Sequence, residues 1–489
     1  MRIQGIAHLL GWMFLSLAVL ALFPLLIAVS VDTRETVTAF VVTIIGSGFV
    51  GGALVLSTRG SGPLDMRRLG VLIVAMFWLV LPIWGALPFH LAGTAPSIVA
   101  AYFEATSGLT TTGATVFDEI SLLPRAIVVW RAELQWIGGL ATLSAWAILV
   151  APDVRSPLFD PSLAPTSLQS GSKWLPRSVF ATIAPLYTGL TFLCFLALAV
   201  AGMPAFDAIC LAFATVSTGG FMPRDGTLVS YGLPGVLWVV TIFMVIGAVS
   251  LFWVRGLLGR QLTVVRGNPE PYWIVTALLL LTAYLLIVAL PTSTNERFAS
   301  ILEATTVIIA TAASHITTTG FAVSDVVHTQ LPLVLILALT FVGAGRYSTA
   351  GGLKFQRIGV MFTAARREFH HLVFPHSAIG GARAQPARTL QTEEAIWVNF
   401  FVVTAAVTVL ALIMSVAGLN LTASLLAAVS AIGNMGPAYD LAASSDIAGR
   451  PTYSEMPPGA QLALAIGMVF GRFEVLALLT LFNLAYWRA

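Results

Sequence analysis

Charged side chains are scarce in this sequence. Aspartate, glutamate, lysine and arginine together make up 10% of its 489 residues, whereas a soluble domain carries about 25%. Hydrophobic residues supply 57% of the chain, and its mean hydropathy is +0.90. These values exclude an ordinary soluble domain and predict an integral membrane protein.

Cysteine is nearly absent as well. The two cysteines, Cys194 and Cys210, lie in apolar segments, so the sequence indicates neither a disulfide framework nor a cysteine metal site. No apolar run carries a convincing catalytic dyad, and the spacing of His370, His371 and His376 does not favour a metal site. We therefore expect that the protein is not an enzyme and that this chain binds no cofactor.

Long apolar runs, by contrast, are frequent. A membrane-spanning helix needs about 20 mostly apolar residues. The first run has too long an apolar core for a signal peptide and lacks a clear cleavage site, so we expect it to be a helix. Ten spans are predicted, at 7–30, 37–58, 69–90, 127–151, 179–201, 231–254, 272–291, 330–350, 395–417 and 460–487.

A short polar turn recurs four times between these spans. The copies read LTTTGAT, VSTGGFM, ITTTGFA and IGNMGPA, and they contain Gly113, Gly220, Gly320 and Gly436. They follow one another at intervals of about 100 to 115 residues, which is typical of an internal repeat. A single TTTG would be weak evidence, whereas four at this period argue against four unrelated helix caps.

Each turn follows a short apolar segment, at 97–107, 206–216, 298–315 and 421–432. The segments at 97–107, 206–216 and 421–432 are too short to cross a bilayer. The longer segment at 298–315 could be miscounted as a span. The predicted unit is a helix, a short re-entrant helix, a turn and a second helix. Because two crossings return the chain to its starting side, all four units can face the same way around one axis.

The charges predict the orientation. Seventeen of the 25 basic residues fall at the ends of the chain or on segments between units, and five fall on the opposite face, so the segments between units should be cytoplasmic. The opposite, outer face carries many acids, among them Asp32, Glu104, Asp118, Asp207 and Asp225. They indicate either a vestibule that concentrates cations or ordinary solvation of loops.

The turns can bind ions. Irregular backbone survives inside a membrane only where it is buried in protein or lines a water-filled cavity, and free carbonyl oxygens there can replace the hydration shell of a cation. The absence of carboxylates within the turns favours a monovalent ion over a divalent one. The predicted ion ligands are Thr111, Thr112, Gly113, Thr218, Gly219, Gly220, Thr318, Thr319, Gly320, Asn434, Met435 and Gly436.

Because of these four turns, the sequence resembles the Trk/Ktr/HKT superfamily of potassium transporters, and in particular its Trk-type membrane subunit. The resemblance covers essentially the whole chain. It includes WRAELQWIGGL after the first turn, STAGGLKFQR after the third, GRFE in the last helix, and two spans before the first unit. It implies K⁺ uptake, with Rb⁺ also accepted, through a filter with one glycine from each unit. Gly113 resembles the K⁺-selective members, and the GNMG of the fourth turn departs from threonine-glycine.

The expected fold class is an all-α polytopic membrane protein. Four pseudo-symmetric helix–pore helix–filter–helix units surround one pore, and two extra transmembrane helices precede them. The expected division is 1–62 for the extra helices, then 63–155, 156–262 and 263–365 for the first three units. Residues 366–489 should hold a basic cytoplasmic segment and the fourth unit. The resemblance implies the cytoplasmic (inner) membrane of a bacterium, with membrane lipid around the chain.

The resemblance also implies a gate in the third unit, where a loop interrupts the last helix below the filter. The matching stretch is GAGRYSTAGG, whose four glycines disfavour a strong helix; a plain flexible helix end is the alternative. Arg472, an intramembrane charge, should set a barrier near the pore or else form a structural pair. The predicted gating residues are Gly343, Gly345, Ser348, Thr349, Gly351, Gly352, Lys354 and Arg472. Arg131 and Glu133 are interpreted as inter-unit packing.

The basic segment 354–388 is expected in the cytoplasm, where it either sets topology or docks a regulatory subunit. In the family this partner is a nucleotide-binding, TrkA-like protein, and the membrane subunit is a homodimer. The stretch GGLKFQR lacks the spacing of a phosphate-binding loop, so nucleotide control would come from the partner. A proton- or sodium-coupled potassium symporter remains the alternative function, although no acid relay is evident at mid-depth.

Overall fold

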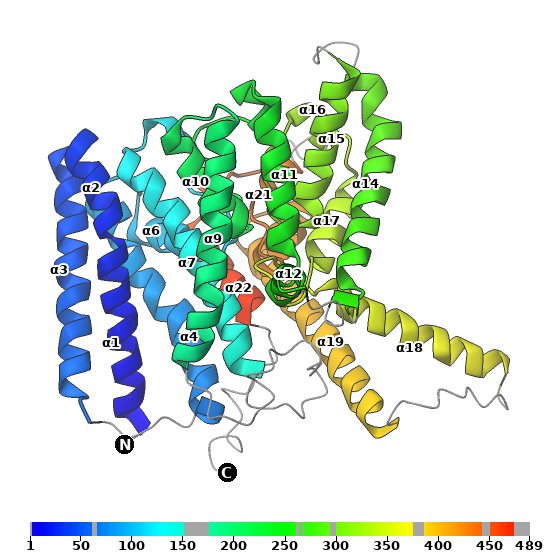
Figure 1. Ribbon diagram of the computed structural model, residues 1–489, viewed down its shortest axis with the longest axis horizontal. Helices are drawn as coiled ribbons and strands as arrows, with labels where there is room; N and C mark the ends of the chain where they lie inside the picture. Colours follow the sequence, from blue (N-terminus) through cyan, green and yellow to red (C-terminus); the bar gives the residue numbers. More distant parts are fainter. Residues whose placement is uncertain are drawn as a thin grey trace.

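The computed structural model describes residues 2–60, 66–150, 176–260, 265–266, 268–293, 300–374, 386–442 and 450–473. Every regular element in these ranges is a helix (Figure 1). Six helical segments are long and apolar enough to cross a membrane, namely Gln4–Val31, Arg34–Ser57, Val74–Leu91, Ile183–Val200, Glu270–Leu290 and Glu393–Val416. The chain is therefore an all-α, multi-pass membrane protein, as predicted.

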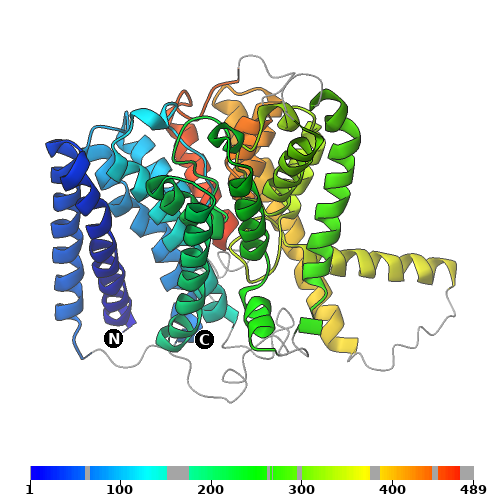
Figure 2. The ribbon, with the colours of Figure 1, turned by 45° about the horizontal axis from the view of Figure 1, so that its top comes forward.

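Three helices precede the first repeat. They are α1 (Arg2–Leu20), α2 (Leu22–Val31) and α3 (Arg34–Ser57), and α1 and α2 together form the first predicted span. Thr33 caps α3, its side chain accepting a hydrogen bond from the N–H of Thr36. Figures 1 and 2 show α1 and α3 side by side at one end of the molecule.

The four units follow with a common plan. Each has an entry helix, a short helix and an exit helix. The entry helices are α4 (Met66–Gly85, continued by α5, Leu87–Leu91), α9 (Pro176–Val200), α14 (Glu270–Ser293) and α19 (Pro386–Val416). The exit helices are α7 (Arg125–Val150), α11 (Pro234–Ala248) with α12 (Leu251–Leu258), α17 (Leu333–Val342) and α22 (Pro458–Phe473).

The short helices are α6 (Ile98–Leu109), α10 (Ala205–Val216), α15 (Ile301–Ile316) and α20 (Leu421–Ile432). Three of them have 12 residues, or about 18 Å of helix, against the roughly 30 Å of a bilayer core. Side chains of Ser97, Ser300 and Asn420 cap α6, α15 and α20. All four end directly at a predicted turn, so the expectation of four short re-entrant segments is confirmed.

Two predicted spans are broken. The span at 231–254 bends by 105° between α11 and α12, at Val249 and Ser250. The span at 330–350 is too long, because α17 ends at Val342, where Gly343 has φ +70°. The last predicted span, 460–487, is described only as far as Phe473.

Smaller elements complete the fold. They are η1 (Ile120–Leu122), η3 (Leu228–Tyr231), α16 (Asp325–His328) and α21 (Pro437–Leu441) on the segments that follow the turns. Helix α18 (Phe355–Val373) projects sideways from the bundle beyond α14 and α19 (Figures 1 and 2). Arg367 on α18 forms an ion pair with Glu393 on α19, and 2.5 Å separate Nη2 and Oε2.

Candidate ion-conducting site

The four turns, numbered 1 to 4 in chain order, share one backbone conformation. They comprise residues 110–113, 217–220, 317–320 and 433–436. The second residue of each has a positive φ: 50° at Thr111, 51° at Thr218, 55° at Thr318 and 49° at Asn434. A positive φ is unfavourable for a threonine, so the surrounding structure must enforce it. Because the angle recurs four times, the turns are structural equivalents.

Their backbone hydrogen bonds are equivalent too. In each turn the N–H of the first residue donates to the carbonyl four residues earlier, the second to the carbonyl three earlier, and the third to the carbonyl five earlier. All twelve bonds have lengths of 2.7–3.2 Å. The turns thus use their N–H groups to cap the short helices. Several turn carbonyls accept bonds from other parts of the chain, among them those of Thr112, Gly219 and Gly436.

The fourth residue distinguishes turn 4 from the others. Gly113, Gly220 and Gly320 have φ of 81°, 84° and 77°, which glycine adopts without a steric cost. Gly436 is instead in the right-handed region, with φ −54°. Lack of space explains the glycine at this position, since a Cβ there would overlap the backbone of Ala114. Asn434 follows the common pattern and Gly436 departs from it.

The turns close into a ring. A Cβ on Gly113 would overlap the carbonyl oxygen of Gly219, which places turn 1 against turn 2. A Cβ on Gly220 would likewise overlap the carbonyl oxygen of Thr319, and one on Gly320 would lie 3.1 Å from Cδ of Pro437. The N–H of Gly436 in turn 4 donates to the carbonyl of Thr112 in turn 1 at 2.6 Å, so turn 4 contacts turn 1 and closes the ring. The structure therefore brings together all twelve residues predicted as ion ligands.

Each turn is braced, but not in the same way. Thr110 and Thr112 pair through their hydroxyls at 2.7 Å in turn 1, and Thr317 and Thr319 do so at 2.7 Å in turn 3. Turns 2 and 4 lack a hydroxyl at one or both of these positions. Their braces are bonds to other parts of the chain.

Asn434 and Tyr453 supply the braces of turn 4. The amide nitrogen of Asn434 donates to Thr112 Oγ1 at 3.0 Å and to the carbonyl of Met468 at 2.8 Å. The hydroxyl of Tyr453 donates to the carbonyl of Gly436 at 3.0 Å. These bonds connect turn 4 to turn 1 and to α22.

The segment 343–354 lies against one end of the ring. Thr349 Oγ1 is 3.1 Å from Thr218 Oγ1 and 3.2 Å from the carbonyl oxygen of Val216. The N–H of Gly351 donates to Thr318 Oγ1 at 2.8 Å, and a Cβ on Gly351 would overlap the Gly433 carbonyl. The segment thus touches turns 2, 3 and 4 at their first and second residues, opposite the terminal glycines.

The rest of this segment is tied to the bent helix of the second unit. The N–H of Gly345 donates to the carbonyl of Ala248 at 3.0 Å, and the carbonyl of Tyr347 accepts from Leu251 at 3.2 Å. Ser348 Oγ donates to the Gly345 carbonyl at 2.5 Å. Gly352 and Lys354 have φ of 73° and 83°. Such a backbone cannot continue α17.

Arg346, which the sequence reasoning left without a role, anchors the segment on its other side. Its N–H donates to Glu270 Oε1 at 2.7 Å, and its guanidinium donates to Gln356 at 3.0 Å. Glu270, the first residue of α14, is buried.

Two cations bond the backbone of the segment, Arg472 from α22 and Lys354 from the segment itself. Arg472 is buried, and its guanidinium donates to the carbonyls of Thr110 and Thr349, the latter at 2.6 Å. It therefore joins turn 1 to the segment. Lys354 Nζ donates to the carbonyls of Ala350 and Gly351. The acid of the GRFE motif, Glu474, lies outside the described residues.

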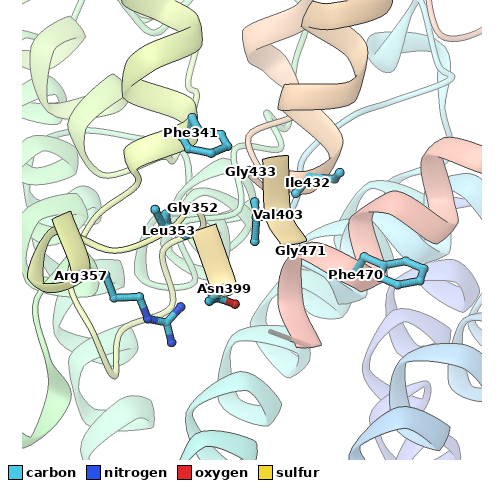
Figure 3. A pocket seen from close by; sticks show the side chains of 10 residues that line it. All are labelled: Phe341, Gly352, Leu353, Arg357, Asn399, Val403, Ile432, Gly433, Phe470 and Gly471. Carbon is cyan, nitrogen blue, oxygen red and sulfur yellow. The ribbon is translucent and has the colours of Figure 1, made fainter. Parts of the chain in front are cut away.

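A small cavity of about 30 Å³ adjoins the same region, enough for a water molecule. Figure 3 shows its lining side chains, which come from the ends of α17, α20 and α22, from the segment 343–354, and from α18 and α19. Arg357 and Asn399 are its polar side chains, and Gly352, Gly433 and Gly471 supply backbone. The cavity thus touches turn 4, the segment and the helix that bears Arg472.

The loops that follow the turns also connect neighbouring units. Asp225 of unit 2 accepts hydrogen bonds from the N–H groups of Ile120 and Ser121 in unit 1, at 2.6 and 2.9 Å. Burial alone would raise the pKa of Asp225, but bonds from Ser121 and Ile120 hold that pKa below its usual value. The carboxylate of Asp118 in unit 1 accepts from Ser454 in unit 4.

Glu104 does not belong to an open vestibule, contrary to one interpretation of the sequence. Its side chain is fully buried on α6, and Arg131 Nε donates to it at 2.7 Å. The Arg131 guanidinium lies 4.2 Å from the ring centroid of Phe221, which follows turn 2. Arg131 therefore does pack between units 1 and 2, as expected, and it does so as the partner of Glu104.

Sequence reasoning missed the residues that support the turns. Gln135, within the WRAELQWIGGL motif, bonds turn 2, and the indole of Trp78 donates to the Leu109 carbonyl at 3.3 Å. Tyr453 bonds turn 4. For Gln135 the available signal was a polar side chain in an apolar helix, but such a side chain does not reveal its distant partner.

Repeated short helices that end in a closed ring of turns, inside a bundle of membrane-spanning helices, define a membrane transport protein. Comparison with known proteins agrees. The sequence matches the TrkH family, described as cation transport proteins, over residues 34–255 and 260–487. It is 34% identical to the Trk system potassium uptake protein TrkH of Salmonella typhimurium, over 88% of each chain, and 33% identical to that of Escherichia coli K12, over 100% of each.

The fold has a solved counterpart. The crystal structure of the potassium transporter TrkH from Vibrio parahaemolyticus superposes with a TM-score of 0.85 at 27% identity, and the match covers 100% of both chains. The chain belongs to the TrkH family of cation transport proteins. The expected kinship with Trk-type membrane subunits and the expected multi-pass membrane location are confirmed.

Proposed function

We propose that this protein takes up potassium ions across the cytoplasmic membrane through the ring of four turns. The closed ring carries the proposal, because it gathers the backbone of four corresponding turns within a membrane-spanning bundle. Such oxygens can replace the water around a dehydrated K⁺ ion. The names of the relatives from Salmonella and Escherichia, both potassium uptake proteins, support K⁺ as the transported ion.

The proposed ion ligands are the carbonyl and hydroxyl oxygens of the four turns. The C-terminal ends of α6, α10, α15 and α20 point their partial negative charge at the same place. No Asp or Glu occurs within any of the turns, which suits a monovalent ion. No further cofactor is part of the proposal.

The segment 343–354 and Arg472 are the proposed gate. Together they contact all four turns, through Thr349, Gly351 and the Arg472 guanidinium. Arg472 places a positive charge next to the carbonyls that a cation must pass, which opposes its passage. Movement of the segment away from the ring would break these bonds and open the path.

A cytosolic nucleotide-binding regulatory subunit, the TrkA-like partner implied by the resemblance, would act on this gate. Helix α18 directly continues the segment and projects from the bundle with Arg357, Arg366 and Arg367 exposed or half-buried along it (Figure 1). A partner bound there could move the segment. Residues 375–385 of the expected docking region lie outside the described residues. A homodimer with one ring in each protomer completes the proposal.

The test is uptake of ⁸⁶Rb⁺ into liposomes that contain the purified protein. We expect uptake that K⁺ suppresses at concentrations at least tenfold below those required of Na⁺. Liposomes with Arg472→Ala protein should take up more ⁸⁶Rb⁺, because we expect the wild-type gate to be closed without its partner. Equal suppression by Na⁺ and K⁺ would contradict the proposed K⁺ uptake. Uptake that requires an imposed proton or sodium gradient would favour the coupled symporter.

A further inference from the structure

Turn 2 contains a glycine that its own backbone does not require. Gly219 occupies the third position of the turn, where turns 1 and 3 have Thr112 and Thr319. Its φ is not positive, unlike that of Gly220. An ordinary side chain is therefore compatible with the backbone at 219, and another cause must account for the glycine.

The cause is Gln135. The three heavy atoms nearest to a Cβ built on Gly219 are Cδ, Oε1 and Nε2 of the Gln135 side chain, with Nε2 at 2.8 Å. Gln135 lies on α7, the exit helix of unit 1, and is fully buried. Its amide group fills the space that a threonine side chain would need at 219.

The amide also bonds turn 2 on both sides of Gly220. Nε2 donates to the carbonyl oxygen of Gly219 at 2.6 Å, and Oε1 accepts from the N–H of Phe221 at 3.3 Å. These bonds fix the peptide groups that enter and leave the terminal glycine of the turn. A buried carbonyl that lost this donor would be free to rotate or would remain unpaired.

We propose that Gln135 is a positioning residue for cation selectivity. It replaces, for turn 2, the hydroxyl pair that braces turns 1 and 3. In those turns a threonine at the third position bonds the threonine at the first, at 2.7 Å. In turn 2 the first position is Ser217, the third is Gly219, and the brace crosses from the neighbouring unit. The inference rests on the proposed function, since it assumes that the ring selects the ion.

A threonine at 219 and the glutamine at 135 cannot occupy the same space. The proposal can therefore be tested by exchanging the Gln135 brace for a hydroxyl pair. Gln135→Ala should free the second turn and lower the preference for K⁺ over Na⁺ about tenfold. Gly219→Thr alone should also lower it, because the new side chain would overlap the amide. Gly219→Thr in the Gln135→Ala background should restore most of the preference, because the introduced hydroxyl could then pair with Ser217 Oγ.

The readout is the ratio of K⁺ to Na⁺ concentrations that halve ⁸⁶Rb⁺ uptake in liposomes. Thermal unfolding of each detergent-purified variant shows whether it folds, and Gln135→Met replaces Gln135→Ala if the latter does not. Thr142→Ala is the matched control on α7, because the Thr142 hydroxyl bonds its own helix at Gly138. This control should leave the ratio unchanged.

The outcomes separate the two claims. A wild-type protein without K⁺ preference would overturn the proposed function and this inference with it. A selective wild-type protein whose preference survives in Gln135→Ala, or in Gln135→Met where the alanine variant does not fold, would overturn this inference alone. So would a double variant no more selective than Gln135→Ala, since it would show that the brace itself does not determine selectivity.

Discussion

Turns 1 and 3 are held by bonds between their own side chains, whereas turns 2 and 4 are held by bonds to other parts of the chain. The hydroxyl pairs of Thr110 with Thr112 and of Thr317 with Thr319 span two residues. The Gln135 bond to Gly219 spans 84 residues, and the Asn434 bond to Thr112 spans 322. The same backbone conformation thus appears with local support in two units and with long-range support in the other two.

The difference shows how a repeated unit can diverge without losing its geometry. The φ of the second residue varies only from 49° to 55° across all four turns, although their sequences read TTTG, STGG, TTTG and GNMG. Where a turn has no hydroxyl pair, a neighbouring part of the bundle supplies the hydrogen bonds. The ring is therefore a property of the whole bundle and not of four independent motifs.

The largest effect should follow a change at a glycine whose φ is positive. Gly113→Ser would strain a residue at φ 81° and push its Cβ into the Gly219 carbonyl of the next turn. Strain of this kind costs about 1–3 kcal/mol, so we expect the K⁺ over Na⁺ preference to fall about tenfold or more. Reversal potentials in mixed K⁺ and Na⁺ solutions measure it. Unchanged potentials would show that turn 1 does not select the ion.

A change at Arg472 tests whether turn 1 also differs from the other turns at the end that faces the segment 343–354. Turns 2, 3 and 4 meet the backbone or Thr349 of the segment 343–354, whereas turn 1 is reached through the Arg472 guanidinium. Arg472→Ala removes the positive charge and the bonds to Thr110 and Thr349, so ⁸⁶Rb⁺ flux should rise several-fold. Arg472→Lys, which keeps the charge, should raise it less. A fall in flux at a normal protein level would contradict a barrier role.

The smallest effect should come from removing a local brace. Thr319→Val keeps the shape of the side chain but deletes the hydroxyl that pairs with Thr317. A hydrogen bond of this kind contributes about 0.5–1.5 kcal/mol, so we expect the selectivity to fall only a few-fold. Thr305→Val on α15, the helix that ends at turn 3, is the control, since the Thr305 hydroxyl bonds the Ile301 carbonyl. An effect as large as that of Gly113→Ser would contradict this expectation, since it would show that turn 3 depends on its local brace as strongly as turn 1 depends on its terminal glycine.

Much of the architecture could be predicted from the sequence. Apolar runs and the period of the turns identified the membrane helices and the four short helices, because both signals are local in the chain. The bend between α11 and α12 was missed, since apolar composition continues across it. Hydropathy also carried the third exit span too far, but the glycines of GAGRYSTAGG had indicated the break that follows α17 at Val342. Hydropathy reports where a segment lies, but not whether its backbone remains helical.

The supports of the site could not be predicted in the same way. Gln135, Tyr453 and Glu270 act through bonds to residues 17 to 84 positions away. In the sequence Gly219 is one more turn glycine, whereas the structure explains it by the volume of the Gln135 amide. Contacts of this kind depend on how units pack around the ring, and a single sequence contains no direct record of that packing.

The most direct test of the ring is to locate a heavy K⁺ analogue in crystals of the protein grown with Tl⁺. Anomalous scattering should show Tl⁺ on the axis enclosed by turns 1 to 4, within about 3 Å of carbonyl oxygens from all four. Exchange into K⁺ should remove that signal, and exchange into Na⁺ at the same concentration should largely leave it. Tl⁺ bound only elsewhere, or displaced equally by both ions, would contradict the account.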